Sequence, residues 1–292
     1  MITVSSLPNN VGIALEGVDL TQPPDACVAD ELRELWLEHG LILLRGQCKT
    51  VSQQIGFSRV FGELEIHPLE RIRHKDYPEL IELSSDDEQT NPTSSWDGED
   101  WIGRLGWHTD LIYSGKPNLG AVLRALVLPQ SNGQTGFADR GAAYDALSDS
   151  VKSDIEDLEV VYRFEVNLYR MPYLDTSKYV AGPGAPDKPA DVGFPDFPDS
   201  VYPLVVSHPV SGRKVLNVCP MFLSHIKGRE EGGGDLLLRS LVDQVTDERF
   251  AYHHSWKRDD IILWDNWRMM HCAPGIRPGD ERLIHRTTII KR

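Results

Sequence analysis

The chain has 292 residues, a formal net charge of −14, 40% hydrophobic residues and 25% charged residues. This length suits one large domain or two small ones and is enough for a sizeable core. The acidic balance argues against nucleic acid or an anionic membrane as a partner, since both require a basic surface. It leaves room for a small anionic substrate, because a site can be locally basic inside an acidic protein.

The four cysteines, Cys27, Cys48, Cys219 and Cys272, form no CxxC pair, which favours a reduced state. No apolar run reaches membrane-spanning length, and the N-terminus has no basic-then-apolar signal pattern. We therefore expect a cytoplasmic protein.

The first part of the chain alternates helical and extended patterns. Residues 25–39 have apolar positions at helical spacing, with Gly40 as a C-cap, and residues 51–61 repeat the pattern before Gly62. The apolar run 41–44 between them predicts a buried strand. Short apolar pieces at 11–15 and 17–20 precede these elements, so helices and strands are mixed from the start.

A long polar region follows. Residues 63–78 predict a loop that holds His67 and His74, and residues 80–83 predict a strand. Residues 84–106 are rich in Asp, Glu, Ser, Asn and Gly but include Trp96 and Trp101. Because tryptophan is uncommon in a purely solvated loop, we interpret this segment as a lid over a substrate.

Strands dominate the second half. Extended patterns occupy residues 119–128, 160–164, 202–206, 214–218, 250–255, 260–263 and 283–290. Helical patterns occupy residues 140–147, 150–158 and 236–245. The segments 202–206 and 214–218 predict a hairpin. Residues 166–200 show no periodicity, so they are a surface excursion, a subunit contact or a substrate-specificity loop. The whole pattern fits an antiparallel sandwich or barrel covered by helices.

The strongest chemical signal is Trp107-His108-Thr109-Asp110. On an extended strand, side chains two residues apart point to the same side, so His108 and Asp110 could bind one metal ion. The apolar stretch before Asp265-Asn266 leads to one more imidazole, His271. Two histidines and one carboxylate with open positions are the facial triad of non-haem Fe(II) oxygenases.

These motifs, with Arg282 eleven residues after His271, resemble the taurine/α-ketoglutarate dioxygenase family, which includes 2,4-dichlorophenoxyacetate dioxygenase. Further matching pieces are Phe61-Gly62-Glu63-Leu64, His67-Pro68, Gly133-Gln134-Thr135, residues 140–147, Trp264-Asp265-Asn266 and residues 282–286. The resemblance implies a mixed α/β, mainly β fold: a double-stranded β-helix (jelly-roll) barrel flanked by helices. Residues 1–292 are then a single domain, with 84–106 and 166–200 as insertions.

The resemblance also implies the cofactors and their ligands. His108, Asp110 and His271 are expected to bind Fe(II), leaving positions for 2-oxoglutarate and O2. Arg282 is expected to hold the distal carboxylate of 2-oxoglutarate through a planar guanidinium fork. Thr135 matches the family's threonine that supports the same carboxylate. The implied activity is oxidation, chiefly hydroxylation, of a C–H bond with release of succinate and CO2.

Three residues match substrate positions of the family. The arginine that grips the anionic group in the taurine enzyme corresponds to Arg286, and a substrate-contacting histidine corresponds to His67. Arg104 replaces a substrate-binding asparagine and Glu70 replaces a tyrosine, which argues against taurine itself. A small substrate that carries a carboxylate or a similar anion is the expectation.

Two alternatives stay open at this point. A metal-dependent hydrolase or isomerase on the same barrel would use the triad to bind zinc or manganese and activate water, but it leaves Arg282 and Thr135 unexplained. A non-catalytic binding protein would not need the triad at all. The sequence leaves open the substrate, the choice between hydroxylation and other oxidations, and whether the chain forms a homo-oligomer. His208, His253 and His254 are interpreted as structural residues.

Overall fold

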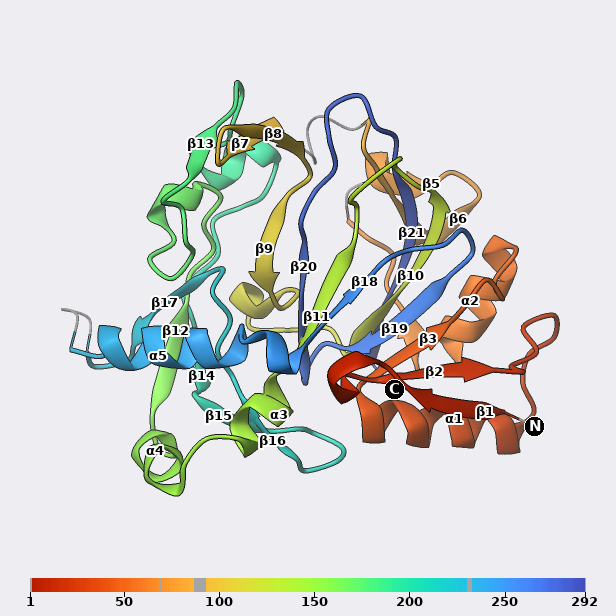
Figure 1. The fold of residues 1–292 in the computed structure, drawn as a ribbon, viewed down its shortest axis with the longest axis horizontal. Helices are drawn as coiled ribbons and strands as arrows, with labels where there is room; N and C mark the ends of the chain where they lie inside the picture. The colour runs from red at the N-terminus through yellow and green to blue at the C-terminus, as the bar shows by residue number, and fades with distance from the viewer. Residues whose placement is uncertain (1, 69, 87–92, 230–232, 292) are drawn as a thin grey trace.

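In the computed structural model, which describes residues 2–68, 70–86, 93–229 and 233–291, two β-sheets face each other (Figure 1). The larger sheet runs in the order β1-β2-β3-β19-β10-β21-β6-β5, with β4 also paired to β21. Its strands are β1 (Thr3–Ser6), β2 (Ile13–Glu16), β3 (Leu41–Leu44), β4 (Glu63–Leu64), β5 (Arg73–His74), β6 (Tyr77–Ser84), β10 (Gly120–Val127), β19 (Ile261–Asp265) and β21 (Leu283–Lys291).

The smaller sheet runs in the order β18-β11-β20-β9 and is antiparallel throughout. Its strands are β18 (Ala251–His254), β11 (Thr135–Asp139), β20 (Met269–Ala273) and β9 (Leu105–His108). Together the two sheets form the double-stranded β-helix that the resemblance implies, so this expectation of the fold class is confirmed.

Side chains alternate between the two faces of each central strand, and both faces are covered, which explains why these strands are apolar throughout. Leu41 and Leu43 of β3 pack between the two sheets, whereas Ile42 and Leu44 pack under the helices on the outer face. All four side chains are buried, because both faces of this strand are covered. The same rule divides β21: Ile284 points into the barrel, and Ile289 points outward.

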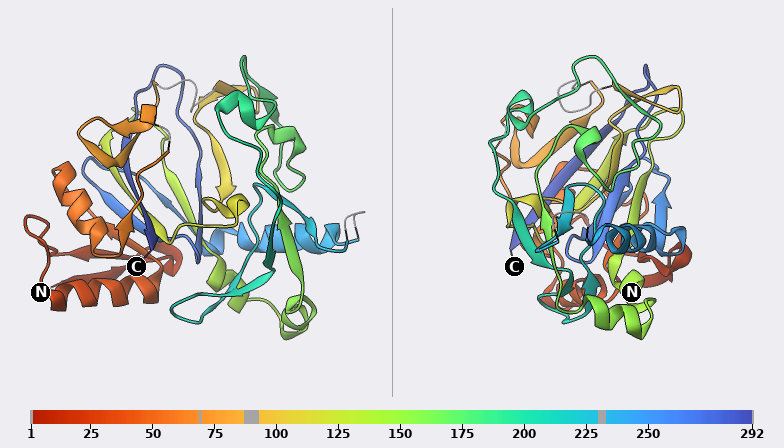
Figure 2. Two further views of the ribbon diagram at one scale, coloured as in Figure 1. Left: turned by 180° about the vertical axis from the view of Figure 1, so that it is seen from behind. Right: turned by 90° about the vertical axis from the view of Figure 1, so that its left-hand side faces the viewer.

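Two helices cover the outer face of the larger sheet, as the opposite views in Figures 1 and 2 show. Helix α1 (Ala26–His39) begins after Asp25, whose side chain accepts a hydrogen bond from Val28 N, and ends at Gly40 with a left-handed φ of 71°. Helix α2 (Val51–Arg59) begins with a capping box between Thr50 and Gln53. Both helices agree with the sequence prediction.

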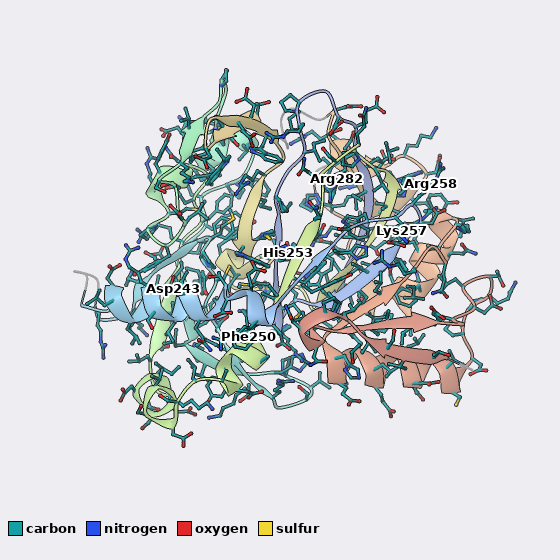
Figure 3. The ribbon with its side chains drawn as sticks, in the orientation of Figure 1. Asp243, Phe250, His253, Lys257, Arg258 and Arg282 are labelled. Carbon is teal, nitrogen blue, oxygen red and sulfur yellow. The ribbon has the colours of Figure 1, made fainter. Side chains whose placement is uncertain are left out.

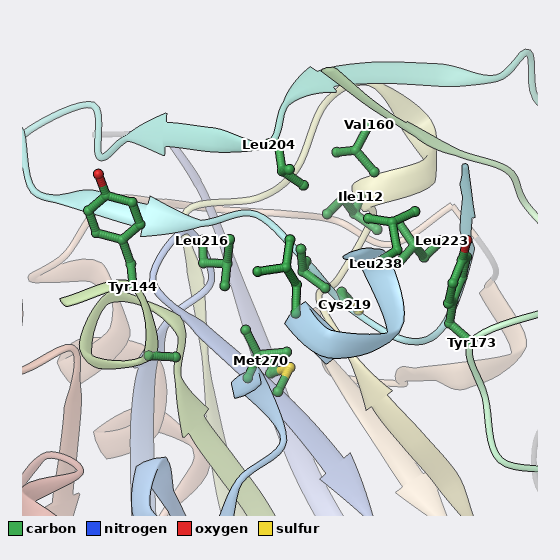
Figure 4. Packing of buried hydrophobic residues seen from close by; sticks show 14 of the residues in the cluster. Ile112, Tyr144, Val160, Tyr173, Leu204, Leu216, Cys219, Leu223, Leu238 and Met270 are labelled. Carbon is green, nitrogen blue, oxygen red and sulfur yellow. The ribbon is translucent and has the colours of Figure 1, made fainter. Parts of the chain in front are cut away.

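A second hydrophobic cluster lies on the other side of the smaller sheet (Figure 4). Helix α5 (Asp235–Val245) contributes Leu238 and Leu241, and β20 contributes Met270. The other elements here are α3 (Arg140–Asp145), α4 (Asp149–Ile155), β12 (Glu159–Tyr162), β14 (Ser200–Pro203), β15 (Val205–Ser207), β16 (Lys214–Leu216) and β17 (Leu223–Ile226).

A buried ion pair lies at one end of the smaller sheet, where β11 ends and β20 begins. Asp139, the last residue of β11, caps α3 and lies 2.5 Å from Arg268 Nη2. Arg268 also donates to the carbonyl oxygen of Glu38 at the end of α1. The pair therefore connects the smaller sheet to the helix that covers the larger one.

The two insertions meet in one small sheet. β7 (Thr93–Trp96) and β8 (Glu99–Ile102) form a hairpin, and β13 (Tyr179–Ala181) pairs with β7. The segments 84–106 and 166–200 are therefore parts of one structure, which sequence periodicity did not reveal. Residues 87–92 of the expected lid lie outside the described residues.

Several boundaries differ from the prediction. The expected strand 202–206 is divided at Leu204, because β14 pairs with β12 while β15 turns to pair with β16. Residues 63–78, expected as a loop, contain β4 and β5, and residues 17–20 form no strand. The short helices are η1 (Pro8–Asn10), η2 (Glu70–Ile72), η3 (Ile112–Ser114), η4 (Leu168–Arg170), η5 (Pro189–Val192) and η6 (Glu248–Phe250).

The four cysteines are all free thiols. Among the described residues, no helix has the length and apolar character needed to cross a membrane.

Candidate active site

His108, Asp110 and His271 come together between the two sheets. His108 ends β9 and lies directly opposite His271 of β20 in the antiparallel register. Their ring centroids are 4.0 Å apart, and the Nε2 atom of each imidazole lies 3.8 Å from Asp110 Oδ1. One ligand atom from each residue therefore faces a common point, although the residues are far apart in sequence.

The positions of both imidazoles are fixed by their surroundings. His108 Nδ1 lies 2.9 Å from the Gly106 carbonyl oxygen and donates its proton there, which leaves the lone pair on Nε2. His271 packs beside Phe137 and Trp264, with ring centroids 6.3 and 4.8 Å away. Its Nδ1 is buried with no hydrogen-bond partner among the described residues.

Asp110 does not lie on the strand that carries His108. β9 ends at His108, and Asp110 occupies the following turn, where Leu111 has a positive φ of 56°. Asn266 holds this turn: its Oδ1 accepts from Asp110 N at 3.1 Å, and its Nδ2 donates to Asp110 O at 3.0 Å. The assumption of one shared strand was therefore wrong, and Asn266 fixes the turn that presents the carboxylate.

Charges around the triad favour an ionised carboxylate and neutral imidazoles. Burial opposes ionisation of Asp110, but the adjacent guanidinium of Arg286 favours the charged form, and the pKa of the carboxyl is lowered. Arg286 Nη2 lies 2.6 Å from Asp110 Oδ2. Burial lowers the pKa of His108 and of His271, so both rings keep a lone pair for a metal.

Arg282 and Thr135 also meet, at the end of the barrel where β21 begins (Figure 3 labels Arg282). Arg282 Nη2 lies 3.5 Å from Thr135 Oγ1, and Trp256 Nε1 donates to the same hydroxyl at 3.0 Å. Arg282 Nε is buried without a partner, and no carboxylate among the described residues forms an ion pair with this guanidinium. Burial lowers its pKa to about 10. The site therefore contains a largely buried positive charge that has no carboxylate partner in the part of the chain that the structure describes.

The structure does not bring Arg104 to the triad. Its guanidinium lies 4.6 Å from the Trp96 ring centroid and 5.9 Å from that of Trp101. Burial lowers the pKa of Arg104, and Cys272, next to His271 in sequence, partly offsets this lowering. Since adjacent residues of β20 point to opposite faces, Arg104 stacks within the inserted hairpin, away from the face that carries His271.

His67 lies in the partly buried segment that follows β4, where its carbonyl oxygen accepts a hydrogen bond from Arg73. No described contact joins its side chain to the triad.

Two residues near the triad escaped the sequence analysis. Burial raises the pKa of Glu65, while Arg286 opposes this rise. Burial, assisted by the charge of Asp110, raises the pKa of Tyr113 to about 12. Both groups therefore lie within electrostatic reach of Asp110 and Arg286. Glu65 stands between the motifs that carried the resemblance, and Tyr113 follows a turn, so neither had a spacing signal.

The sequence matches known proteins over nearly the whole chain. The profile of the taurine catabolism dioxygenase TauD, TfdA family matches residues 3–288. The (S)-phenoxypropionate/α-ketoglutarate dioxygenase of Sphingobium herbicidovorans is 32% identical over 286 residues, which cover 98% of this chain and 94% of that protein. The α-ketoglutarate-dependent 2,4-dichlorophenoxyacetate dioxygenase of Cupriavidus pinatubonensis is 29% identical over 287 residues, covering 94% and 93%.

A solved structure agrees with these relatives. The crystal structure of a taurine dioxygenase from Burkholderia xenovorans aligns with a TM-score of 0.78 and 27% identity, covering 100% of this chain and 90% of that one. The fold and the relatives agree, and the chain belongs to the TauD/TfdA family of Fe(II)- and 2-oxoglutarate-dependent dioxygenases.

Proposed function

We propose that His108, Asp110 and His271 hold the Fe(II) of this dioxygenase. The observation that carries the proposal is the approach of two imidazole Nε2 atoms to 3.8 Å from one carboxylate oxygen. Imidazole and carboxylate suit ferrous iron, and three protein ligands leave positions for other ligands. The buried triad offers no cysteine and no fourth His, Asp or Glu among the described residues, so it does not form a site closed by four protein ligands and leaves positions open.

We further propose that Arg282 and Thr135 bind the distal carboxylate of 2-oxoglutarate. A buried guanidinium without a counter-ion is costly, and a carboxylate that enters beside it compensates the charge. Trp256 Nε1 donates a hydrogen bond to the Thr135 hydroxyl oxygen, so the hydroxyl proton of Thr135 stays available for the cosubstrate. The hydrolase alternative gives neither Arg282 nor Thr135 a role.

Arg286 is the proposed anchor for the prime substrate. The two terminal nitrogens of Arg286 donate to the Asp110 carboxylate, Nη2 at 2.6 Å and Nη1 at 3.5 Å. The Nε atom of Arg286 is buried and has no hydrogen-bond partner among the described residues. The Arg286 guanidinium thus holds the Asp110 carboxylate in place, and its Nε remains as a hydrogen-bond donor for the substrate. Since the two relatives are named for phenoxypropionate and 2,4-dichlorophenoxyacetate, we infer an aryloxy carboxylate or a similar small anion as substrate.

The overall reaction is then R–H + O2 + 2-oxoglutarate → R–OH + succinate + CO2. Bound iron supplies the activation of O2 that C–H oxidation requires. The chain binds and orients both anions, keeps the imidazoles neutral through burial, and holds Asp110 ionised beside Arg286. The free thiols are consistent with a reducing, cytoplasmic location, which is part of this proposal.

The test is succinate release with a matched set of compounds. Phenoxyacetate and the two enantiomers of 2-phenoxypropionate are compared with their uncharged primary amides, which keep the ring and lose the anion. We expect acids to stimulate turnover and amides not to, and Arg286→Gln to remove the difference. Equal stimulation by acids and amides contradicts the role of Arg286, whereas turnover without O2 contradicts the reaction itself.

A further inference from the structure

We propose that the chain carries an accessory site for a zinc-like divalent cation, formed by His74, Glu82 and His285. The three residues come from the neighbouring strands β5, β6 and β21 of the larger sheet. One ligand atom from each residue lies within 4.8 Å of the others. Nothing in the dioxygenase reaction requires this cluster.

The cluster lies on the opposite face of β21 from the active site. Arg286 faces Asp110 inside the barrel, so the adjacent side chain of His285 points outward. Ile289, which lies on the same face of β21 as His285, agrees, since it packs under the helices on the outer face. The accessory site and the iron triad are therefore separated by the sheet itself.

Strand pairing brings the ligands together. His285 is directly opposite Glu82 in the β6–β21 register, and its Nε2 lies 3.5 Å from Glu82 Oε1. The His74 and His285 rings meet edge to face, with centroids 5.6 Å apart and an interplanar angle of 88°. Two imidazoles and a carboxylate that converge in this way form a suitable ligand set for zinc.

The buried side chain of His285 is well suited to bind a metal. Its side chain is only 4% exposed, and its Nδ1 is buried with no hydrogen-bond partner among the described residues. Metals bind the neutral imidazole, and a side chain buried this deeply favours the neutral ring.

The other charges around the cluster permit a cation. Arg124 is the nearby positive group, but its Nη2 lies 2.7 Å from Asp259, which compensates its charge. His74 Nδ1 accepts a hydrogen bond from Asp76 N at 3.1 Å, and metal binding through either nitrogen replaces this bond. That replacement is inexpensive because Asp76 is exposed to water. Glu82 is 42% exposed, so water can complete the coordination.

A bound cation would join the edge strand β5 to β6 and β21, the two strands next to the anion-binding arginines. β21 leads from Arg282 to Arg286, and β6 ends beside Ser85, whose hydroxyl accepts from Arg282 N at 3.0 Å. We therefore assign the accessory metal a structural role, as a clamp on the outer face of the strands that position the anion-binding arginines.

The test counts Co(II) sites in tag-free apoprotein by calorimetry and by visible absorption. Wild type is expected to bind two equivalents, and the double variant His108→Ala/His271→Ala one. Glu82→Gln is expected to lose the second site. Since losing even an outer-shell partner costs metal sites about 10–100-fold in affinity, loss of a ligand should cost at least that. Glu79→Gln, with the same charge change on the same strand outside the cluster, is the control.

The outcomes separate this proposal from the dioxygenase reaction. One Co(II) equivalent in wild type and none in the double variant overturns the accessory site and leaves the iron triad intact. Unchanged binding in Glu82→Gln also overturns it. Because Glu82 is exposed, the variant is expected to fold, and circular dichroism checks this directly.

Discussion

Replacing Arg282 by Met should have opposite effects on cosubstrate binding and on stability. The structure gives this guanidinium one long contact, 3.5 Å from Thr135, and no counter-ion among the described residues. Burial lowers its pKa to about 10 from an ordinary value near 12.5. This difference corresponds to at most about 3 kcal/mol of unfavourable burial. Without cosubstrate, Arg282→Met should therefore be as stable as wild type or more stable.

The same substitution should weaken binding of 2-oxoglutarate. Hydrogen bonds to charged groups contribute about 1.5–3 kcal/mol each, so losing a two-bond fork costs about 3 kcal/mol or more. We therefore expect a rise in Kd of roughly a hundredfold or more. The Kd of Arg282→Lys for 2-oxoglutarate should lie between those of wild type and Arg282→Met, because lysine keeps the positive charge but cannot form the two parallel hydrogen bonds.

Two measurements check this pair of effects. Urea unfolding in EDTA gives the stability without cosubstrate, and anaerobic titration with 2-oxoglutarate in the presence of Fe(II) gives the affinity. Arg277→Met is the matched control, since Arg277 stacks 3.8 Å from the Trp101 ring centroid and pairs with Glu99 on the surface. The reasoning is refuted if Arg282→Met binds 2-oxoglutarate like wild type, or if it loses more than about 1 kcal/mol of stability.

Three further predictions address the substrate anchor, the core and the pH dependence. Arg286→Gln should raise KM for the prime substrate more than for 2-oxoglutarate, which steady-state succinate assays separate; equal changes would contradict its role. Arg268→Met leaves Asp139 buried without its partner and should cost about 3–5 kcal/mol in urea unfolding. The pKa of His285 is about 4 when folded and about 6.5 when unfolded, so stability falls as pH drops from 6.5 towards 4. Between pH 7 and 5 in EDTA His285 contributes about 2 kcal/mol of this loss, so His285→Gln should lose about 2 kcal/mol less than wild type.

The candidate ligands could be predicted from the sequence because His108 and Asp110 are closely spaced and because the order of the motifs, which resembles that of the family, pointed to His271 and Arg282. The fold brings His108, Asp110 and His271 together. The local geometry was less predictable. Asp110 reaches the site from a turn held by Asn266, and a hydrogen bond between residues 156 positions apart leaves no periodic signal.

Long-range pairing explains the other differences. β7 and β13 belong to two insertions, and their edge-to-edge pairing depends on the barrel that carries both of them. Arg104 matched a substrate position by its place in the chain, but stacking on Trp96 turns it away from the triad. The cluster of His74, Glu82 and His285 was invisible for the same reason, since only strand register brings it together.

The most direct test of the account is an anaerobic titration of the apoprotein with Fe(II) and 2-oxoglutarate, followed by visible absorption. We predict a weak metal-to-ligand charge-transfer band that is lost in His108→Ala, weakened in Arg282→Met and unchanged in Glu82→Gln. If the folded, iron-loaded wild type gives no band, or if His108→Ala retains it, then the assignment of His108, Asp110 and His271 as the iron ligands is contradicted.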